Sequence, residues 1–302
     1  MKLPFKFLLP AVRRKVKKMR AECALQACPN TLLMRSVPQN RAGINVGRLW
    51  YCSVDCFAAA ARPRFAELSS GLVAEMPHTP RMSIGLVMLS KGYLTDDQLR
   101  LAVSESQLNG EEMEATLIRL GLANERQLTV ARAAQWGYPV FGQDRIGQAV
   151  ETDIPATLLR MCSAAPLHHS ATAKRVLLGF VHRVDHSLLH SLELITGCRA
   201  EPCFVTPTEF GEQMERLATD PDCEEVVFEE FKSPAQMART VGGFAVEVVA
   251  REASFAQCRD YVWTRLSGKR RKIDVLFRVK NFADAGKRRF STTFEENVSS
   301  LG

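Results

Sequence analysis

Four cysteines near the N-terminus have the residue type and spacing of a metal site. Cys23 and Cys28 are separated by four residues, Cys52 and Cys56 by three, and 23 residues lie between the two pairs. Four thiolates complete a tetrahedral Zn²⁺ site and leave no open position for catalysis. The pattern therefore predicts a structural zinc ion held by these four residues. The alternative is four buried or free thiols in a weakly ordered arm.

The sequence around the second pair supports the zinc interpretation. The segment GRLWYCSVDCF over residues 47–57 resembles the second half of a treble-clef zinc finger of the FCS/TRASH type. In such fingers this segment begins a helix and its cysteines bind zinc, although both pairs here are wider than the usual CxxC. Residues 21–64 contain few large apolar side chains, so we expect the segment to need a metal to fold.

Composition and charge indicate an intracellular protein with basic patches. The 302 residues are 46% hydrophobic and carry a net charge of +7. Residues 1–20 contain eight Lys/Arg and no acid, and residues 265–289 contain ten Lys/Arg and two Asp, so the remainder sums to 7 − 8 − 8 = −9. Such patches can contact nucleic acid or, peripherally, an anionic membrane; a solvated tail and a solvated turn are the simpler interpretation. No run is long enough for a transmembrane helix and no secretory leader is evident, so we expect a cytoplasmic location.

An internal repeat follows the cysteine-containing segment. The segment Gly92–Leu99 aligns with Gly121–Leu128 at an offset of 29 residues. Each copy predicts a helix, a glycine in the left-handed conformation, and a second helix that begins with a capping box. The capping pairs are Thr95 with Gln98 and Asn124 with Gln127. We therefore expect two helical hairpins that pack as a four-helix unit.

The repeat and the sequence after it resemble a known domain. Residues 81–217 are similar to the N-terminal domain of type II secretion and type IV pilus assembly ATPases, the GspE N-terminal or MshEN family. The family motif RLGxxLLxxGLLxxxxLxxxLxxQ falls on residues 83–106 and 112–135. The resemblance implies a helical part over residues 81–137 and an α/β part over residues 138–217.

A phosphate-binding loop of the form GxxxxGK[ST], which the motor domain of these ATPases requires, is absent from the sequence. About 85 residues follow the resemblance. The resemblance therefore implies a non-enzymatic adaptor or regulatory relative that docks onto a protein of a secretion or pilus machine.

Some members of the family bind cyclic di-GMP through the two motifs, which makes a cyclic di-GMP sensor the alternative function. The arginine of each motif contacts a guanine, its glycine lets the backbone approach, and its apolar residues pack against the ligand. Here Ser83 replaces the first arginine, and Glu112-Met113-Glu114 replaces the second RLG. The candidate ligand-binding residues that remain are Ile84, Gly85, Met88, Leu89, Gly92, Leu117, Ile118 and Gly121. A zinc-finger nucleic-acid binder is the second alternative.

The expected fold class is α+β with several domains: a small zinc-finger-like arm, a four-helix repeat unit with a small α/β sandwich, and a C-terminal helix and β-hairpin. In the α/β part we expect strands at Lys174–His182 and Arg199–Val205, a helix capped by Asp153, and a helix from Asp185 to Gly197. A helix from Ser233 and a hairpin of Tyr261–Leu266 and Ile273–Val279 should follow, whereas Asp220–Glu230 should be a solvated loop and helix start. The expected boundaries are 1–20, 21–64, 65–80 (a linker), 81–217 and 218–302.

Overall fold

The computed structural model describes residues 22–30, 43–70, 81–142, 150–170, 172–219, 222–231 and 233–279. The basic lead and most of the predicted linker lie outside these residues. Within the described residues, none of the helices combines the length and the apolar composition needed to span a bilayer.

The repeat forms a four-helix unit, as predicted. Its helices are α3 (Ile84–Ser90), α4 (Asp96–Asn109), α5 (Met113–Arg119) and α6 (Glu125–Trp136). Both predicted capping boxes are present, at the start of α4 and of α6. Gly92 and Gly121 follow the first helix of each copy with φ of +71° and +63°, a backbone conformation that favours glycine. Helix α3 packs against α6, and α4 packs against α5.

The α/β part contains a three-stranded sheet between two helical layers. Its strands are β4 (Ala164–Ser170), β5 (Arg175–Phe180) and β6 (Arg199–Phe204), and its helices are α7 (Ala156–Met161), α8 (His186–Thr196) and α9 (Pro207–Glu215). Strand β5 pairs antiparallel with β4 and parallel with β6, and α8 connects β5 to β6. Helix α8 begins after its N-cap Asp185 and ends at Gly197, as predicted.

One local prediction in this part is wrong, and one strand has no counterpart among the predicted strands. Asp153 does not cap a helix, because Pro155 is the N-cap of α7; the side chain of Asp153 instead forms ion pairs with Arg265 and Lys272. Strand β4 lies outside the predicted strands, and it contains His168 and His169.

A six-stranded sheet joins the two ends of the described chain. Its strand order is β2 (Leu49–Tyr51), β1 (Ile44–Val46), β9 (Glu252–Cys258), β10 (Tyr261–Ser267), β11 (Lys272–Arg278) and β8 (Cys223–Phe228). The predicted hairpin is present as β10 and β11. Strand β8 occupies the stretch expected to be a loop and helix start, so that expectation is wrong. Two two-residue strands, β3 (Glu151–Thr152) and β7 (Ala218–Thr219), pair separately.

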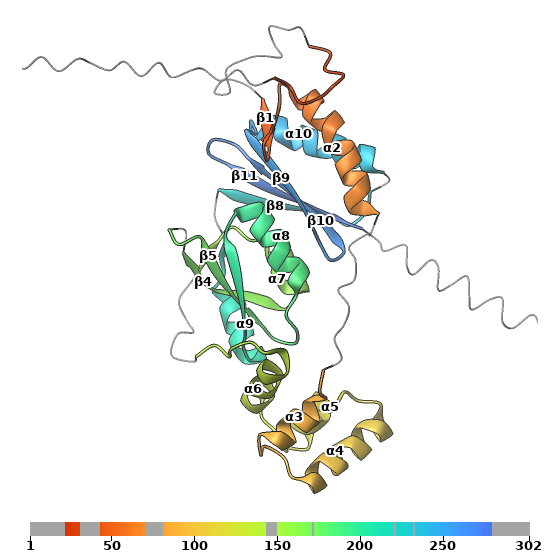
Figure 1. The fold of residues 1–302 in the computed structure, drawn as a ribbon, viewed down its shortest axis with the longest axis vertical. Helices are drawn as coiled ribbons and strands as arrows, with labels where there is room; N and C mark the ends of the chain where they lie inside the picture. The colour runs from red at the N-terminus through yellow and green to blue at the C-terminus, as the bar shows by residue number, and fades with distance from the viewer. Residues whose placement is uncertain are drawn as a thin grey trace, which may run out of the picture.

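Pairing between β1 and β9 places the cysteine-containing segment and the C-terminal extension in one sheet (Figure 1). The expected boundaries treat residues 21–64 and 218–302 as separate units, and the structure differs because Asn45 pairs with Glu252 and Val46 with Ala253. A pairing between strands so far apart in sequence has no local sequence signal. Figure 1 shows the N-terminal elements, in orange, beside the blue C-terminal elements.

Both faces of the six-stranded sheet are covered by helices. Helices α2 (Val54–Ser69) and α10 (Pro234–Glu247) pack together on one face, over Val262, Val275 and Phe277. Helices α7 and α8 lie on the other face, over Trp263 and Leu276. Because α7 and α8 also contact the three-stranded sheet, the α/β part and the C-terminal sheet share one hydrophobic core.

Candidate metal centre and helical repeat

The four predicted cysteines converge on one point. Their Sγ atoms all lie within 4.8 Å of one another. The Sγ of Cys28 lies 3.6 Å from that of Cys52 and 3.7 Å from that of Cys56, and Cys52 and Cys56 are 3.8 Å apart. Four sulfurs around Zn²⁺ at about 2.3 Å would be separated by about 3.8 Å. The donor set and its spacing therefore fit a tetrahedral metal ion.

Two short segments position these thiols. Cys52 directly follows β2, and Cys56 lies in the first turn of α2, where its N–H donates to the Oγ of the N-cap Ser53 at 3.2 Å. Cys23 and Cys28 lie in the segment 22–30, which is joined to β2 by a 2.8 Å hydrogen bond from the N–H of Ala24 to the carbonyl of Trp50. The start of α2 and the strand before it thus fix half of the donor set.

The electrostatic surroundings of the thiols differ from one cysteine to the next. Burial raises the pKa of Cys56 to about 12. Burial also acts to raise the pKa of Cys28, but a hydrogen bond to the backbone of Asn30 and contacts with the neighbouring thiols lower it overall. The side chain of Asn30 donates to the Sγ of Cys52 at 3.0 Å, which would stabilise a thiolate. Since a divalent cation displaces thiol protons, metal binding at this cluster would release protons.

The eight candidate residues for a cyclic di-GMP site all lie in the four-helix unit, and they differ in exposure. Met88 and Leu117 are fully buried in its core. Gly85 is buried as well, and an added Cβ there would lie 2.6 Å from Cδ1 of Leu99, so the end of that leucine side chain would have to move. Of the other five, Gly92, Ile118 and Gly121 are exposed. Ile84 and Leu89 are half-buried.

In the second motif, an internal contact involves Glu114, which stands where the family motif has a glycine. Glu114 forms an ion pair with Arg132 on α6, and Arg132 also donates to the carbonyl of Val181. The side chain of Arg132 is only 6% exposed. This buried arginine joins the four-helix unit to the α/β part. Sequence reasoning missed it, although an arginine among the apolar residues of a predicted helix was a signal.

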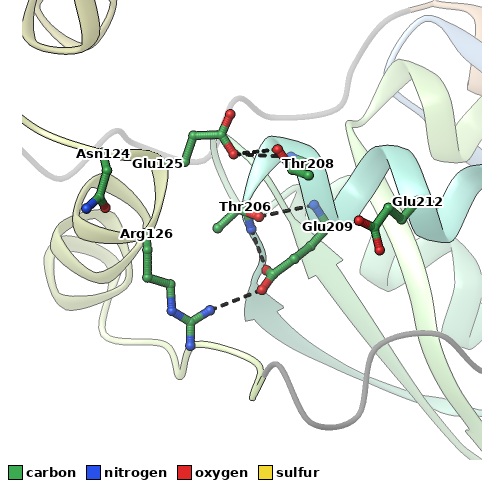
Figure 2. A pocket seen from close by; sticks show the side chains of 7 residues that line it. All are labelled: Asn124, Glu125, Arg126, Thr206, Thr208, Glu209 and Glu212. Atoms are coloured by element: carbon green, nitrogen blue, oxygen red, sulfur yellow. Dashed lines mark hydrogen bonds and ion pairs between the residues drawn. The ribbon is translucent and has the colours of Figure 1, made fainter. Parts of the chain in front are cut away.

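A polar cavity of about 550 Å³ lies where α6 meets α9 (Figure 2). Glu125 accepts a 2.8 Å hydrogen bond from the hydroxyl of Thr208. Glu209 closes a capping box with Thr206 and also pairs with Arg126 at 3.3 Å. Most of the polar groups drawn there form hydrogen bonds or ion pairs with one another. The cavity therefore lies at a polar contact between the helical and α/β parts.

Exposed apolar side chains concentrate in the four-helix unit. Among the described residues, nine large hydrophobic side chains are strongly exposed, and five of them belong to residues 82–118. Leu101 and Leu108 lie two turns apart on α4 and are 50% and 80% exposed. The five are Met82, Leu86, Leu101, Leu108 and Ile118.

No family model matches the sequence. The chain is 27% identical over 129 residues to the type IV pilus assembly ATPase PilB of Thermus thermophilus; the match covers 42% of this chain and 14% of that protein. The resemblance to a domain of these ATPases is thereby confirmed.

Two solved structures are also similar to part of the chain. A structure of MshE with cdg is 21% identical, with a TM-score of 0.38, and covers 46% of this chain and 100% of that chain. The N-terminal domain of XpsE is 22% identical, with a TM-score of 0.34, and covers 44% of this chain and 92% of that chain. These TM-scores lie below the level at which a shared fold follows.

Proposed function

We propose that this chain is a non-enzymatic adaptor that docks onto a protein of a secretion or pilus assembly machine. Its similarity to a pilus assembly ATPase supports the proposal, because the match covers only 14% of that protein and this sequence contains no GxxxxGK[ST] segment. Without that loop, the chain lacks the backbone cradle and lysine that hold nucleotide phosphates in such motors.

The exposed apolar residues of the four-helix unit are the observation that carries this proposal. Contiguous or closely spaced apolar side chains on a surface favour a protein interface over a solvated face. Leu101 and Leu108 on α4 are the most direct candidates, since they share one face of the helix at a spacing of seven residues. We therefore place the docking surface on this unit.

Affinity capture with surface variants tests the adaptor role. The full chain, immobilised and incubated with purified assembly proteins of a pilus or secretion system, should retain a partner. The double change Leu101→Asp and Leu108→Asp should abolish retention. The matched control is Val246→Asp, at a residue 63% exposed on α10; it should bind like the parent chain. Equal binding by all three proteins would contradict the placement, and nucleotide hydrolysis by the purified chain would contradict the non-enzymatic role.

We further propose that the four-cysteine cluster holds a structural zinc ion. The sulfur spacing supports this proposal, as does the convergence of all four thiols from two segments. With four protein ligands the ion would have no open position, so it would stabilise the fold and would not activate water. Metal analysis of the purified chain should give one zinc per protein.

The cyclic di-GMP sensor stays an alternative proposal, and calorimetry separates it from the adaptor. Titration of cyclic di-GMP into the zinc-loaded chain should show no heat if the degenerate motifs serve packing alone, as Gly85 and Glu114 suggest. Saturable micromolar binding would support the sensor. The nucleic-acid alternative predicts binding that weakens steeply with added salt and depends on Cys23 or Cys52.

A further inference from the structure

The N-terminal hairpin, defined as β1, β2 and the turn between them (Ile44–Tyr51), covers one edge of the C-terminal sheet. Strand β1 pairs with β9 through two registered residue pairs, Asn45 with Glu252 and Val46 with Ala253. The N–H of Asn45 adds a 2.8 Å hydrogen bond to the carbonyl of Arg251, and its side-chain amide donates to the same oxygen at 3.2 Å. Without the hairpin, β9 would be an edge strand with unpaired backbone groups.

Backbone pairing alone holds this hairpin weakly. Each of its strands has three residues, and an isolated two-stranded hairpin is marginally stable in water. The hairpin needs further anchors, and three of its side chains are buried: Ile44, Trp50 and Tyr51. The remaining anchor is at its end, where Cys52 follows Tyr51 directly.

The cysteine cluster connects the hairpin to both of its neighbours. Cys52 joins β2 to the site, and Cys56 joins the site to the first turn of α2. The other two ligands, Cys23 and Cys28, belong to the segment that bonds to Trp50 through Ala24. A metal ion at this point would therefore tie together the hairpin, the segment before it and the helix after it.

Helix α2 packs against the sheet through contacts that do not involve the metal site. Phe57 and Phe65 are fully buried, and the ring of Phe65 packs edge-on against Phe255 and Phe277 at 5.3 and 5.9 Å. Burial of these rings removes apolar surface from water and so stabilises the packing of α2 on the sheet. Loss of the metal removes one anchor from the hairpin, whereas the contacts of Phe57 and Phe65 that hold α2 remain.

We infer that metal occupancy of the Cys23–Cys28–Cys52–Cys56 cluster controls whether the edge of β9 is covered. With the metal bound, the N-terminal hairpin completes the six-stranded sheet. After the metal leaves, the hairpin opens locally and exposes the backbone N–H and C=O groups at the edge of β9. This inference rests on the proposed metal site and adds a metal-dependent sheet edge to it.

Hydrogen exchange on the full chain tests the inference. The zinc-loaded protein is compared with the same protein stripped by 1,10-phenanthroline at neutral pH, with metal content measured in each sample. Amides of the hairpin and of Glu252–Ala253 should exchange about tenfold faster, or more, in the stripped protein, since local openings set exchange rates. Amides of the central strands β10 and β11 should change little.

Two variants separate the metal from the hairpin. Cys56→Ser should behave like the stripped protein, whereas the matched control Cys198→Ser changes a half-buried cysteine outside the cluster and should leave zinc and exchange unaltered. Asn45→Pro removes the N–H that donates to Arg251 and leaves all four cysteines in place. It should bind zinc and still show fast exchange at the edge of β9.

The outcomes are distinct. If the chain binds no zinc, the metal site and the inference both fail. If it binds zinc but stripping leaves hairpin exchange unchanged, the metal site stands and the inference is overturned. If stripping accelerates exchange throughout β10 and β11 as well, the metal stabilises the whole fold, and a local metal-controlled edge is also overturned.

Discussion

Arg265 on β10 and Asp274 on β11 form a two-bond ion pair inside the protein. The Nε and Nη2 atoms of the arginine lie 2.8 and 2.7 Å from the two carboxylate oxygens, and the side chains are 5% and 1% exposed. Asp274 also accepts from Nε1 of Trp263 at 2.7 Å. A third charge reaches the pair from the α/β part, because Arg265 contacts Asp153. The pair therefore connects the centre of the six-stranded sheet to the segment before α7.

Breaking this pair should strongly destabilise the protein. The change Asp274→Asn leaves the guanidinium of Arg265 buried with one carboxylate partner fewer, and removing one member of a buried pair costs about 3–5 kcal/mol. The measurement is the free energy of unfolding in urea. The control Glu224→Gln breaks the exposed pair with Arg271, whose members are 52% and 51% exposed, and should cost at most about 1 kcal/mol. Equal effects of the two changes would contradict the role of burial.

The contribution of Asp153 should disappear at acid pH. Burial would raise its pKa, but the charges of Arg265 and Lys272 outweigh that effect and hold the pKa below its usual value. A carboxyl group with a depressed folded pKa stabilises the protein above its unfolded pKa of about 3.9, and that stabilisation is lost as the pH falls through the folded value. Asp153→Asn should therefore be less stable than the parent at pH 7, and the gap should close below about pH 4.

Urea unfolding at a series of pH values from 7 to about 3 checks this dependence. The control is Asp97→Asn, at an exposed residue in the first turn of α4. A stability gap for Asp153→Asn that stays constant across the series would show that its ion pairs do not account for the effect.

Gly85→Ala should stabilise the protein less than an unobstructed glycine-to-alanine change in a helix. The new Cβ would lie 2.6 Å from Cδ1 of Leu99, so the end of that side chain must turn away, and this opposes the gain in helix propensity. The matched control is Gly211→Ala in α9, where nothing lies within 4 Å of the added atom. That change should stabilise by roughly 0.5–1 kcal/mol, because alanine favours a helix. Thermal unfolding of both variants decides, and a stabilisation of Gly85→Ala as large as that of Gly211→Ala would refute the packing argument.

Zinc content should follow the four cysteines and no others. Cys23→Ser and Cys52→Ser should each lower zinc from one equivalent to near zero, since structural sites need all four ligands. Cys223→Ser should retain the full equivalent, because this thiol lies beside Asp274 and away from the cluster. Metal analysis after dialysis against a zinc-buffered solution gives the answer. Full zinc content in Cys52→Ser would remove that residue from the ligand set.

The sequence by itself determined the features that depend on neighbours in the chain. The helical hairpins, both capping boxes and the α8 helix between Asp185 and Gly197 follow from apolar spacing and helix-end chemistry, which act within a few residues. The cysteine cluster could also be anticipated, because four thiols at such spacings have few other uses in a short segment.

Only the tertiary structure decided which residues, far apart in the sequence, contact one another. The pairing of Asn45 with Glu252 makes one sheet of two distant segments. The contact between Glu114 and Arg132 involves a residue that stands where the family motif has a glycine. Asp153 looked like a helix cap by its local context, yet Arg265, more than a hundred residues later, binds it. Strand pairing and buried ion pairs are set by the whole hydrophobic core, so no local pattern in the sequence reveals the partner.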